Sequence, residues 1–382
     1  MPTTVMKKRV LLLTDAHLNL VWSLPRIIHA AGAHLVLMAP EEQCFRHSRF
    51  VDEWVDVPRA TPDIVAPRLR AHLAEHPYDL VVHANPGVVE VLLEGPQPPA
   101  SMEWLRADVA RAVAMKTDFH PWALAHEIPV PPGRVCTTQD EACAWVAEHG
   151  LSVIKCDAMH GGMGVMQVAS PDEVRTLWPQ LNQRVVVLQK FIQGPVGCTE
   201  LILQHGRVAG WFASIKERSI TPFGASIMRK LVHPPDMADI VQKISAATEF
   251  HGLCGFDWML DEATGRVVVL EFHPRATSGF CWGRVAGVDV AAALHDLLSE
   301  NPAELRAPKS AEQLARAPLC CYFPAHFWWA LTVQRSDLKY WLPFTNAVSW
   351  RSIPFDDPRL LAGVCAFALR NLCRRHLPRL MT

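Results

Sequence analysis

The sequence predicts a protein that joins an α/β domain to α+β domains and ends in a C-terminal extension. Three observations lead to this fold class. Short apolar segments alternate with helical segments up to about residue 110, paired β-segments with tight turns follow, and the composition becomes rich in prolines and aromatic residues after residue 301. Alternation is typical of a parallel sheet, and hairpins of antiparallel ones. A chain of 382 residues also exceeds one ordinary core, so several domains are expected.

The N-terminal domain is predicted from its apolar segments. The run from Lys8 to Thr14 is short, apolar and bounded by polar residues, as buried parallel strands are. A helical pattern then extends to Gly32, and the sequence Thr-Pro-Asp from Thr61 begins a second helix. Further strands are expected at 33–40, 51–58 and 78–84. Strands and helices thus alternate as in a small doubly wound domain.

The middle of the chain predicts a different arrangement. Helices are expected at 138–150, 170–178, 236–252 and 288–298, and strands at 132–136, 151–157, 184–192, 253–261 and 266–275. Between them, residues 199–215 form a predicted hairpin with His205 and Gly206 at its turn. Consecutive strands joined by short turns pair antiparallel, so this half of the chain is expected to be α+β.

Charge and cysteine usage exclude several classes of protein. Lys and Arg number 37 against 38 Asp and Glu, so the chain has no overall attraction to nucleic acid, and none is expected as a partner. The eleven cysteines are scattered without a CxxC pair, which fits neither a zinc ribbon nor a disulfide framework. No apolar segment is long enough to span a membrane, and the N-terminus reads as a strand rather than a signal peptide. A cytoplasmic location is therefore expected.

Two acidic residues are predicted to face each other near the ends of neighbouring strands. Asp257 lies on the first strand, while Glu271 and His273 share one face of the next. The short connection pairs the strands antiparallel and brings Asp257 close to Glu271. Adjacent carboxylates repel unless a cation bridges them or one is protonated, and magnesium prefers oxygen ligands. The pattern predicts a magnesium site, with solvent-facing charges at strand ends as the alternative.

A glycine-rich loop near a lysine suggests phosphate binding. Lys155 ends a strand and is followed by Gly161, Gly162 and Gly164. Glycines let backbone N–H groups approach phosphates, and the lysine adds positive charge. Because the lysine precedes the glycines, the segment is not a P-loop, and its spacing is not GxGxxG. An ordinary hairpin turn is the alternative interpretation.

Further segments can complete a nucleotide site. Lys116 lies in a helix that runs into a proline-rich turn, where alone it would be read as a surface lysine. A linker between two domains could form backbone hydrogen bonds with the edge of a purine base. Its apolar side chains could pack against the purine ring. That linker consists of Gln189, Lys190, Phe191 and Ile192. Beyond it, Glu200 could hold ribose hydroxyls, and Arg275 could hold a phosphoryl group bidentately.

Taken in order, these segments resemble the ATP-grasp superfamily of carboxylate–amine ligases. The resemblance extends over roughly residues 5–300. Its four motifs are Lys116 with Ile128 to Pro131, Lys155 with Gly161 to Gly164, Gln189 to Gly194 with Glu200, and Asp257 with Glu271 and His273-Pro274-Arg275. The resemblance implies a Rossmann-like domain at 1–112 and a two-lobed ATP-grasp fold. Its lid subdomain is expected at 113–190, its metal-binding subdomain at 191–300, and the C-terminal extension at 301–382.

The resemblance also implies the cofactors ATP and magnesium, with two ions and manganese as a substitute. Both lysines would contact the phosphates, the glycine loop would cover them, and the linker would read adenine. Asp257, Glu271 and His273 would hold the metal. His273 stands where the family has asparagine, and imidazole is a softer ligand than an amide oxygen. It could bind the metal weakly, bind through water, or contact phosphate.

The implied activity is ligation of a small-molecule carboxylate, activated as an acyl phosphate, to an amine. Arg275, Lys155 and Arg229 are the expected catalytic residues, since this chemistry needs positioning and charge neutralisation. The expected substrate-binding residues surround the acceptor site and are Arg218, Ser278, Gly279 and Arg284. Amino acids, peptides and secondary-metabolite acids all fit as substrates, and the sequence does not distinguish between these substrate classes.

Three other functions compete with this interpretation. Asp15 and His17 after the first strand resemble part of a binuclear metallophosphoesterase motif, although the required GD and GNH motifs are missing. A mononuclear metal-dependent hydrolase could use Asp257, Glu271 and His273, but it leaves the lysines and the glycine loop unexplained. A nucleotide-binding protein without catalysis is the third, because His273 replaces the usual asparagine.

The C-terminal extension is aromatic-rich and then apolar and basic. Such a composition can lie on a membrane surface, but packing on the catalytic body or on a second subunit is favoured. A homodimer is the default assembly.

Overall fold

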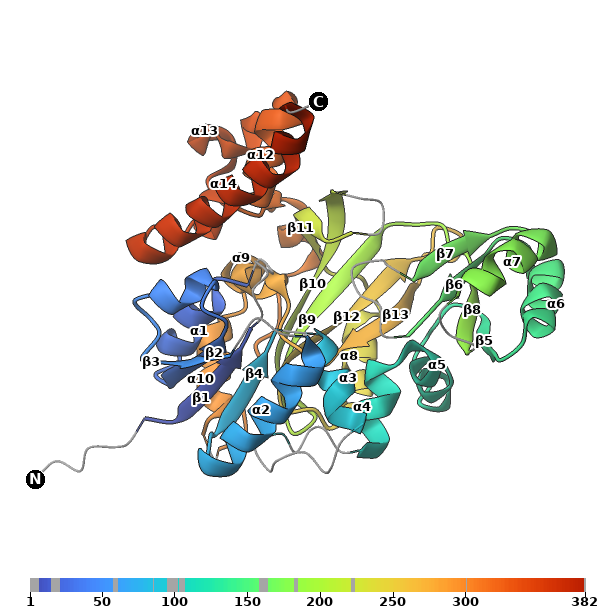
Figure 1. Cartoon of the computed structure of the whole chain (residues 1–382), viewed down its shortest axis with the longest axis horizontal. Coiled ribbons are helices and arrows are strands. Elements are labelled where there is room, and N and C mark those ends of the chain that lie inside the picture. The colour runs from blue at the N-terminus through green and yellow to red at the C-terminus, as the bar shows by residue number, and fades with distance from the viewer. Residues whose placement is uncertain are drawn as a thin grey trace, which may run out of the picture.

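The computed structural model describes residues 7–14, 21–57, 61–84, 86–94, 102, 107–157, 164–181, 185–220, 224–299 and 301–380. Three sheets organise this part of the chain (Figure 1). A six-stranded sheet lies in the middle of the molecule, with a parallel sheet on one side and a smaller sheet that projects on the other. The mixed α/β and α+β fold expected from the sequence is confirmed.

The N-terminal sheet is parallel, with strand order β3-β2-β1-β4. Its strands are β1 (Arg9–Leu13), β2 (His34–Ala39), β3 (Glu53–Asp56) and β4 (Leu80–His83), and its helices are α1 (Leu24–Ala30), α2 (Pro62–Glu75) and α3 (Pro86–Glu94). Consecutive residues such as Leu11 and Leu12 are fully buried, because both faces of β1 are covered. The predicted strand–helix alternation is therefore confirmed.

The projecting sheet follows two helices, α4 (Ala107–Ala114) and α5 (Lys116–Ala125). Its order is β5-β8-β6-β7, formed by β5 (Gly133–Cys136), β6 (Ser152–Lys155), β7 (Val165–Val168) and β8 (Val186–Lys190). Helices α6 (Gln139–His149) and α7 (Pro171–Leu177) complete it. Thr138 and Glu141 form a capping box that fixes the start of α6.

The six-stranded sheet has the order β13-β12-β9-β10-β11-β14, and every neighbouring pair is antiparallel. Its strands are β9 (Val196–Gln204), β10 (Arg207–Ser219), β11 (Ser226–Val232), β12 (Gly252–Leu260), β13 (Val267–His273) and β14 (Cys320–Cys321), with α8 (Met237–Thr248) packed against it. The predicted β9–β10 turn is confirmed, since His205 and Gly206 have φ values of 46° and 76°.

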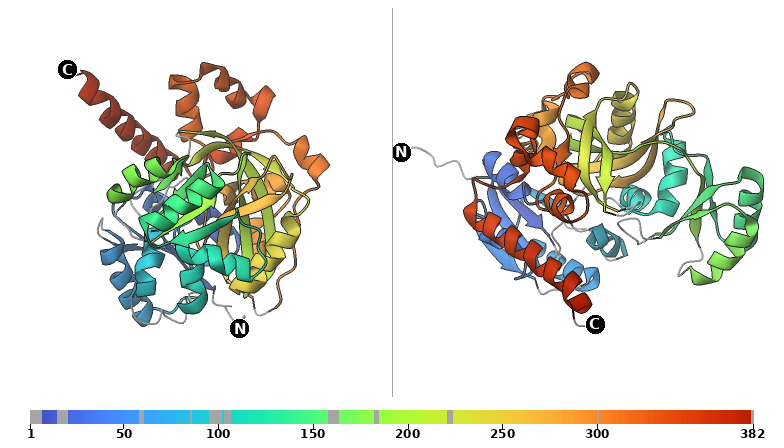
Figure 2. Two further views of the ribbon diagram at one scale, coloured as in Figure 1. Left: turned by 90° about the vertical axis from the view of Figure 1, so that its right-hand side faces the viewer. Right: turned by 90° about the horizontal axis from the view of Figure 1, so that it is seen from above.

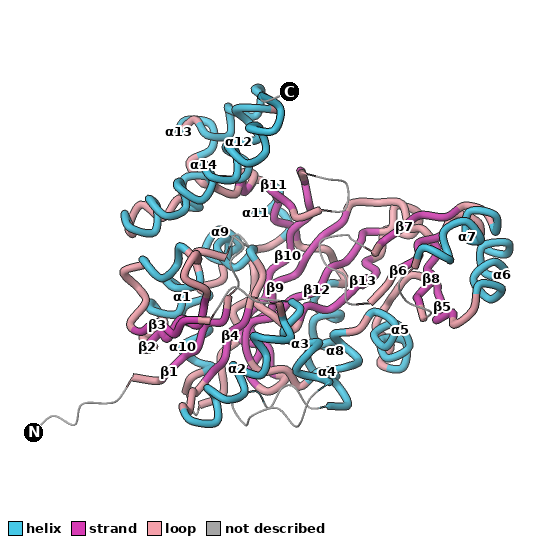
Figure 3. The backbone as a smooth tube through the Cα atoms, viewed as in Figure 1, coloured by secondary structure: helices cyan, strands magenta, loops and turns pink. Residues whose placement is uncertain are grey.

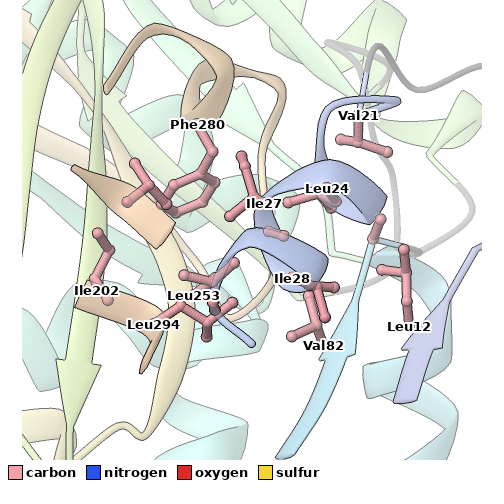
Figure 4. Packing of buried hydrophobic residues seen from close by; sticks show 14 of the residues in the cluster. Leu12, Val21, Leu24, Ile27, Ile28, Val82, Ile202, Leu253, Phe280 and Leu294 are labelled. Carbon is pink, nitrogen blue, oxygen red and sulfur yellow. The ribbon is translucent and has the colours of Figure 1, made fainter. Parts of the chain in front are cut away.

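One hydrophobic core joins the N-terminal domain to the six-stranded sheet. Leu12, Ile28 and Val82 from the parallel sheet and α1 belong to the same buried cluster as Ile202 and Phe280 (Figure 4). The two parts therefore pack against each other rather than being connected only by the chain.

The C-terminal region packs on both of these parts. After α9 (Gly283–Ala286) and α10 (Val290–Leu297), which precede it, this region contains α11 (Ala311–Ala315), α12 (Ala325–Thr332), α13 (Pro343–Asn346) and α14 (Pro358–Leu380). Strand β14 extends the six-stranded sheet by pairing with β11. The indole Nε1 of Trp22 donates a 2.9 Å hydrogen bond to the Ser352 carbonyl, and Ser48 donates one of 2.6 Å to Asp357. Seen from above, α14 crosses the N-terminal domain (Figure 2).

These contacts agree with the packing interpretation of the extension. Among the described residues, no helix combines the length and apolar character needed to cross a membrane.

Candidate nucleotide and metal site

A cavity of about 340 Å³ lies between the projecting sheet and the β12–β13 end of the six-stranded sheet. The chain passes between these sheets through residues 191–195, directly after β8 (Figure 3). Both lobes and the linker between them line the cavity. Its predicted site residues are Lys116, Lys155, Gln189, Lys190, Phe191, Ile192, Asp257, Glu271, His273 and Arg275. Residues that lie up to 159 positions apart in the sequence therefore converge on one space.

The acidic residues meet as the strand pattern predicted. Asp257 on β12 is directly opposite Glu271 on β13, and His273 lies two residues further along the same strand. His273 Nε2 lies 3.3 Å from Asp257 Oδ1 and 3.9 Å from Glu271 Oε1. One ligand atom from each of the three lies within 4.8 Å of the others. Two carboxylates and an imidazole thus form a compact group able to hold a divalent cation.

Asp257 is charged despite its environment. Burial by itself raises the pKa of this carboxyl, but the His273 imidazole, Lys216 and Arg229 more than offset burial and hold the pKa well below its usual range. A deprotonated carboxylate is the form that binds a metal ion.

Two lysines supply positive charge beside the acidic group. Lys116, the first residue of α5, places Nζ 3.9 Å from Glu271 Oε2. Lys155 ends β6, is only 9% exposed, and donates a 3.4 Å hydrogen bond to the Leu270 carbonyl. Burial lowers the pKa of Lys155 to about 8, although Glu271 acts in the opposite direction. Both cations project into the cavity from the projecting lobe, opposite the carboxylates.

Apolar side chains also line the cavity, and they are Val153, Val165, Ile192, Met259 and Leu270. The linker is held to the projecting sheet by the Phe191 amide, which donates a 3.0 Å hydrogen bond to the Leu151 carbonyl. A flat aromatic group could therefore lie at the linker, while charged groups extend toward the lysines and carboxylates.

Of the predicted glycine loop, only Gly164 lies within the described residues. It has a φ of 74° and its carbonyl accepts a 2.9 Å hydrogen bond from the Cys156 amide. Gly161 and Gly162 lie outside the described residues, as do Asp15 and His17.

Glu200 and Arg229 do not line the cavity but lie on the same face of the six-stranded sheet, further from the linker. Glu200 is fully buried on β9 and accepts a 2.9 Å hydrogen bond from Thr277. Arg229 on β11 is 6% exposed and donates to Ser214 at 3.1 Å. Burial raises the pKa of Glu200. Its position in the sheet interior gives no support to the predicted ribose contact.

The Ser278–Gly279 turn covers Glu200. A side chain at position 279 would collide with the Glu200 carboxylate, so only glycine allows this close approach. The turn therefore contributes to the wall around Glu200 and is not part of the cavity lining.

The remaining two predicted substrate residues make other contacts. Arg218 Nε lies 2.8 Å from Oδ2 of Asp337, a buried residue of the C-terminal region. The Arg284 side chain is 72% exposed and lies 3.9 Å from Asp289. Neither lines the cavity. Both arginines thus lie near acidic side chains, and their substrate contacts stay predictions.

Several cavity residues were not predicted. Glu90 at the N-terminal domain and Gln167 on β7 line it. Behind the linker, buried His120 contacts Gln189. These residues come from three separate segments, and no local sequence pattern marks them.

Comparison with known proteins identifies the fold. No protein-family model matches the chain. The biotin carboxylase domain of 2-oxoglutarate carboxylase from Hydrogenobacter thermophilus, whose structure contains MgADP and bicarbonate, superposes with a TM-score of 0.60 at 18% identity, covering 81% of this chain and 72% of that one. N5-carboxyaminoimidazole synthetase from Staphylococcus aureus gives 0.58 at 12% identity, covering 81% and 82%.

Two further similarities agree with this result. L-amino acid ligase from Bacillus licheniformis superposes with a TM-score of 0.52 at 16% identity, covering 84% of this chain and 81% of that one. Acetyl-CoA carboxylase 2 from Arabidopsis thaliana is 25% identical over 306 residues, which is 66% of this chain and 13% of the plant protein. The chain thus spans only a small part of that relative. The protein has the ATP-grasp fold, as the ordered motifs predicted.

Proposed function

We propose that this protein is an ATP- and magnesium-dependent ligase that activates a small-molecule carboxylate and joins it to an amine. The observation that carries the proposal is the convergence of an acidic pair, two lysines and an interlobe linker on one cavity. The fold supports it, because the similar solved structures include a biotin carboxylase domain and an L-amino acid ligase. Neither a hydrolase nor the metallophosphoesterase alternative accounts for the lysines.

ATP would lie along the cavity with its base at the linker and its phosphates at the lysines. Lys190 and the backbone of Phe191 and Ile192 would contact the base. Lys116 and Lys155 would pair with the phosphate oxygens, which need cationic partners in a site shielded from water. Gly161, Gly162 and Gly164 would cover the phosphates as predicted.

The residues present fit a magnesium ion. Asp257 and Glu271 supply the hard oxygen ligands that magnesium prefers, and His273 lies close enough to contact the ion directly or through water. Magnesium held by these residues would neutralise the negative charge of the phosphate groups. Manganese accepts imidazole more readily, so it is expected to substitute.

In the proposed reaction, a carboxylate oxygen of the substrate attacks the γ-phosphorus of ATP and ADP leaves. The amine then attacks the acyl phosphate, inorganic phosphate departs, and the nitrogen loses a proton. Arg275 and Lys155 would stabilise the transferring phosphoryl group. Arg229, on the same sheet face as Asp257, would orient the acyl phosphate from the acceptor side.

The acceptor is expected next to the polar strip formed by Glu200, Ser214 and Arg229. Within the described residues, Glu200 Oε2 and Arg229 Nε are buried without hydrogen-bond partners, and such atoms are costly unless a ligand satisfies them. Ser278 and Gly279 would shape this side by covering Glu200. The contacts of Arg218 and Arg284 argue for structural and surface roles instead.

The test is ADP release from ATP and magnesium in the presence of a panel of acids that includes bicarbonate and α-amino acids, each with and without an amine panel. The proposal predicts ADP release that depends on one class of acid and a product that contains the amine. Hydrolysis of an ester or phosphoester without ATP would instead support the metal-dependent hydrolase. Nucleotide binding without turnover on any acid would support the non-catalytic alternative.

Nucleotide affinity is expected to decrease as the pH rises through about 8. Lys155 has a free-state pKa of about 8, below its ordinary value, so above this pH it is neutral and must take up a proton to pair with phosphate. The affinity for ADP should therefore fall by up to about tenfold per pH unit between pH 8 and pH 9.5. Calorimetric titration at pH 7, 8 and 9 measures this change.

The matched variant for this experiment is Lys155→Arg, whose guanidinium remains charged over the whole range. It should bind ADP with an affinity that hardly depends on pH. A wild-type affinity as independent of pH as that of the variant would show that Lys155 does not pair with the phosphates.

A further inference from the structure

The C-terminal region exposes an unusual number of apolar side chains. In the part of the chain that the structure describes, thirteen large hydrophobic side chains are exposed, and six of them lie within residues 333–369. They are Val333, Leu342, Phe344, Trp350, Phe355 and Leu369. Exposed apolar side chains scattered singly need no explanation, but their concentration in one segment is typical of an interaction surface.

Several of these side chains lie on short helices that pack together. Helix α13 packs against the two 3₁₀ helices η5 (Arg335–Trp341) and η6 (Ser349–Ser352). Leu342 directly follows η5, Phe344 lies on α13, and Trp350 lies on η6. Phe344 is fully exposed, and α13 lies on the side of the C-terminal region opposite the N-terminal domain (Figure 1). The apolar side chains thus belong to one outward-facing unit.

Trp350 presents its ring to the outside rather than its polar edge. Its indole Nε1 donates a 3.0 Å hydrogen bond to the Trp341 carbonyl. Phe355 stacks on the indole with ring centroids 5.9 Å apart, and both side chains are exposed. Because the indole N–H is satisfied within the protein, the exposed part of this pair is apolar. Aromatic side chains of this kind are enriched where a protein meets the boundary between lipid and water.

The same part of the chain is basic. Residues 331–382 contain eight Arg and Lys residues against three Asp residues, so residues 1–330 hold 29 of the 37 cations and 35 of the 38 acids. Two of the three acids, Asp337 and Asp357, are buried in hydrogen bonds within the protein. The third, Asp356, pairs with Arg26 of the N-terminal domain. This separation of charge predicts an anionic partner for the C-terminal region.

Unpaired cations lie next to the exposed apolar groups. Lys339 is on η5, three residues before Leu342, and Arg351 directly follows Trp350 on η6. Both side chains are exposed, and neither forms an ion pair with any carboxylate of the described residues. An apolar surface bordered by unpaired positive charge is the pattern of proteins that bind at the surface of an anionic membrane.

Other occupants fit this surface less well. A second copy of the chain would meet it through the same patch on both subunits and would therefore place cations against cations. Duplex nucleic acid would use the cations through its phosphates but would leave the apolar side chains without a contact. A bilayer surface supplies phosphate groups and apolar chains together, and because it is fluid it accepts the protruding Phe344 without a preformed pocket.

We propose that the C-terminal region docks this protein on the surface of an anionic lipid bilayer. Leu342, Phe344 and the exposed ring of Trp350 would enter the boundary between headgroups and acyl chains. Lys339 and Arg351 would lie among the lipid phosphates. The opposite side of the region remains packed on the body of the protein, and the inference does not depend on the nucleotide function of the cavity.

The test measures binding of the full-length protein to lipid vesicles by co-sedimentation. Vesicles of phosphatidylcholine with about one third phosphatidylglycerol should bind the protein at least about tenfold more tightly than vesicles of phosphatidylcholine alone. Binding to the anionic vesicles should weaken as the salt concentration rises, because salt screens the attraction between exposed charges.

Two variants separate the apolar and the charged contributions. Phe344→Ala removes a fully exposed side chain, so the thermal midpoint should stay unchanged while binding to anionic vesicles weakens about tenfold. Lys339→Gln combined with Arg351→Gln should weaken it by about tenfold or more and reduce its dependence on salt.

Matched controls lie elsewhere on the surface. Ile64→Ala shortens an exposed apolar side chain of α2 in the N-terminal domain. Arg316→Gln removes an exposed cation that is paired with Glu312 at 2.7 Å. Both variants should bind anionic vesicles as the wild type does.

Equal binding of the wild type to both kinds of vesicle would overturn the proposal, as would a Phe344→Ala protein that binds anionic vesicles with full affinity. Binding to duplex DNA or to polyglutamate, without binding to anionic vesicles, would assign the surface to a nucleic acid or to an acidic protein and would overturn it as well.

Discussion

Replacing Glu271 with glutamine is expected to abolish the magnesium dependence of nucleotide binding and to reduce ADP release by about 10³-fold. The amide keeps the size of the side chain but removes one of the two carboxylates that face each other across β12 and β13. It also removes a negative charge near Lys116, whose Nζ lies 3.9 Å from Glu271 Oε2. Asp257 and His273 alone would hold the cation too weakly to fix the phosphates for transfer.

Calorimetry with ADP in magnesium and in EDTA measures the first effect without knowledge of the acid substrate, and the acid found with the panel serves for the second. Glu217→Gln is the matched control, because Glu217 is exposed and follows Lys216 on β10. It should behave as the wild type. A Glu271→Gln protein that still bound ADP more tightly with magnesium, and released ADP at the normal rate, would place the metal elsewhere.

Replacing Asp337 with alanine is expected to destabilise the protein by about 2 kcal/mol, less than breaking a fully buried ion pair costs, because the Arg218 side chain is 32% exposed. The Asp337 side chain is 4% exposed, and Oδ2 lies 2.8 Å from Arg218 Nε on β10 and 3.6 Å from His326 Nε2 on α12. His326 in turn accepts a 3.0 Å hydrogen bond from Trp341. Removal of the carboxylate leaves Arg218 without this partner and removes one of the contacts between the C-terminal region and the six-stranded sheet.

Chemical denaturation and the thermal midpoint measure this loss. Asp356→Ala makes the same substitution in the same region, but its pair with Arg26 is 3.3 Å long and both side chains are 44% exposed. Exposed pairs contribute at most about 1 kcal/mol, so this control should shift stability little. Equal effects of the two substitutions would mean that the Arg218–Asp337 pair does not anchor the extension.

The sequence predicted the residues at the centre of the cavity better than those around it. Asp257, Glu271 and His273 could be placed together because side chains alternate along strands and a short turn fixes the pairing of β12 with β13. Lys155 and the linker followed from their positions at strand ends. Each of these inferences needs only local periodicity and one short connection, which a single sequence contains.

The remaining features depend on long-range packing. Arg218 and Arg229 look equivalent in the sequence, yet one pairs with Asp337, which is 119 residues away, and the other is buried beside Ser214. His120 meets Gln189, which is 69 residues away, only because α5 packs against β8. Likewise, β14 is too short for its pattern to distinguish it from a loop, and its pairing with β11 depends on the fold of the whole sheet.

The most direct test of the central claim is a crystal structure with a non-hydrolysable ATP analogue and magnesium. We predict that the adenine lies against the linker at Gln189 to Ile192, that Lys116 and Lys155 contact the phosphates, and that at least one magnesium ion lies between Asp257 and Glu271. The γ-phosphate should then face the strip formed by Glu200, Ser214 and Arg229. An analogue bound outside this cavity, or a metal ion that does not contact either carboxylate, would contradict the account.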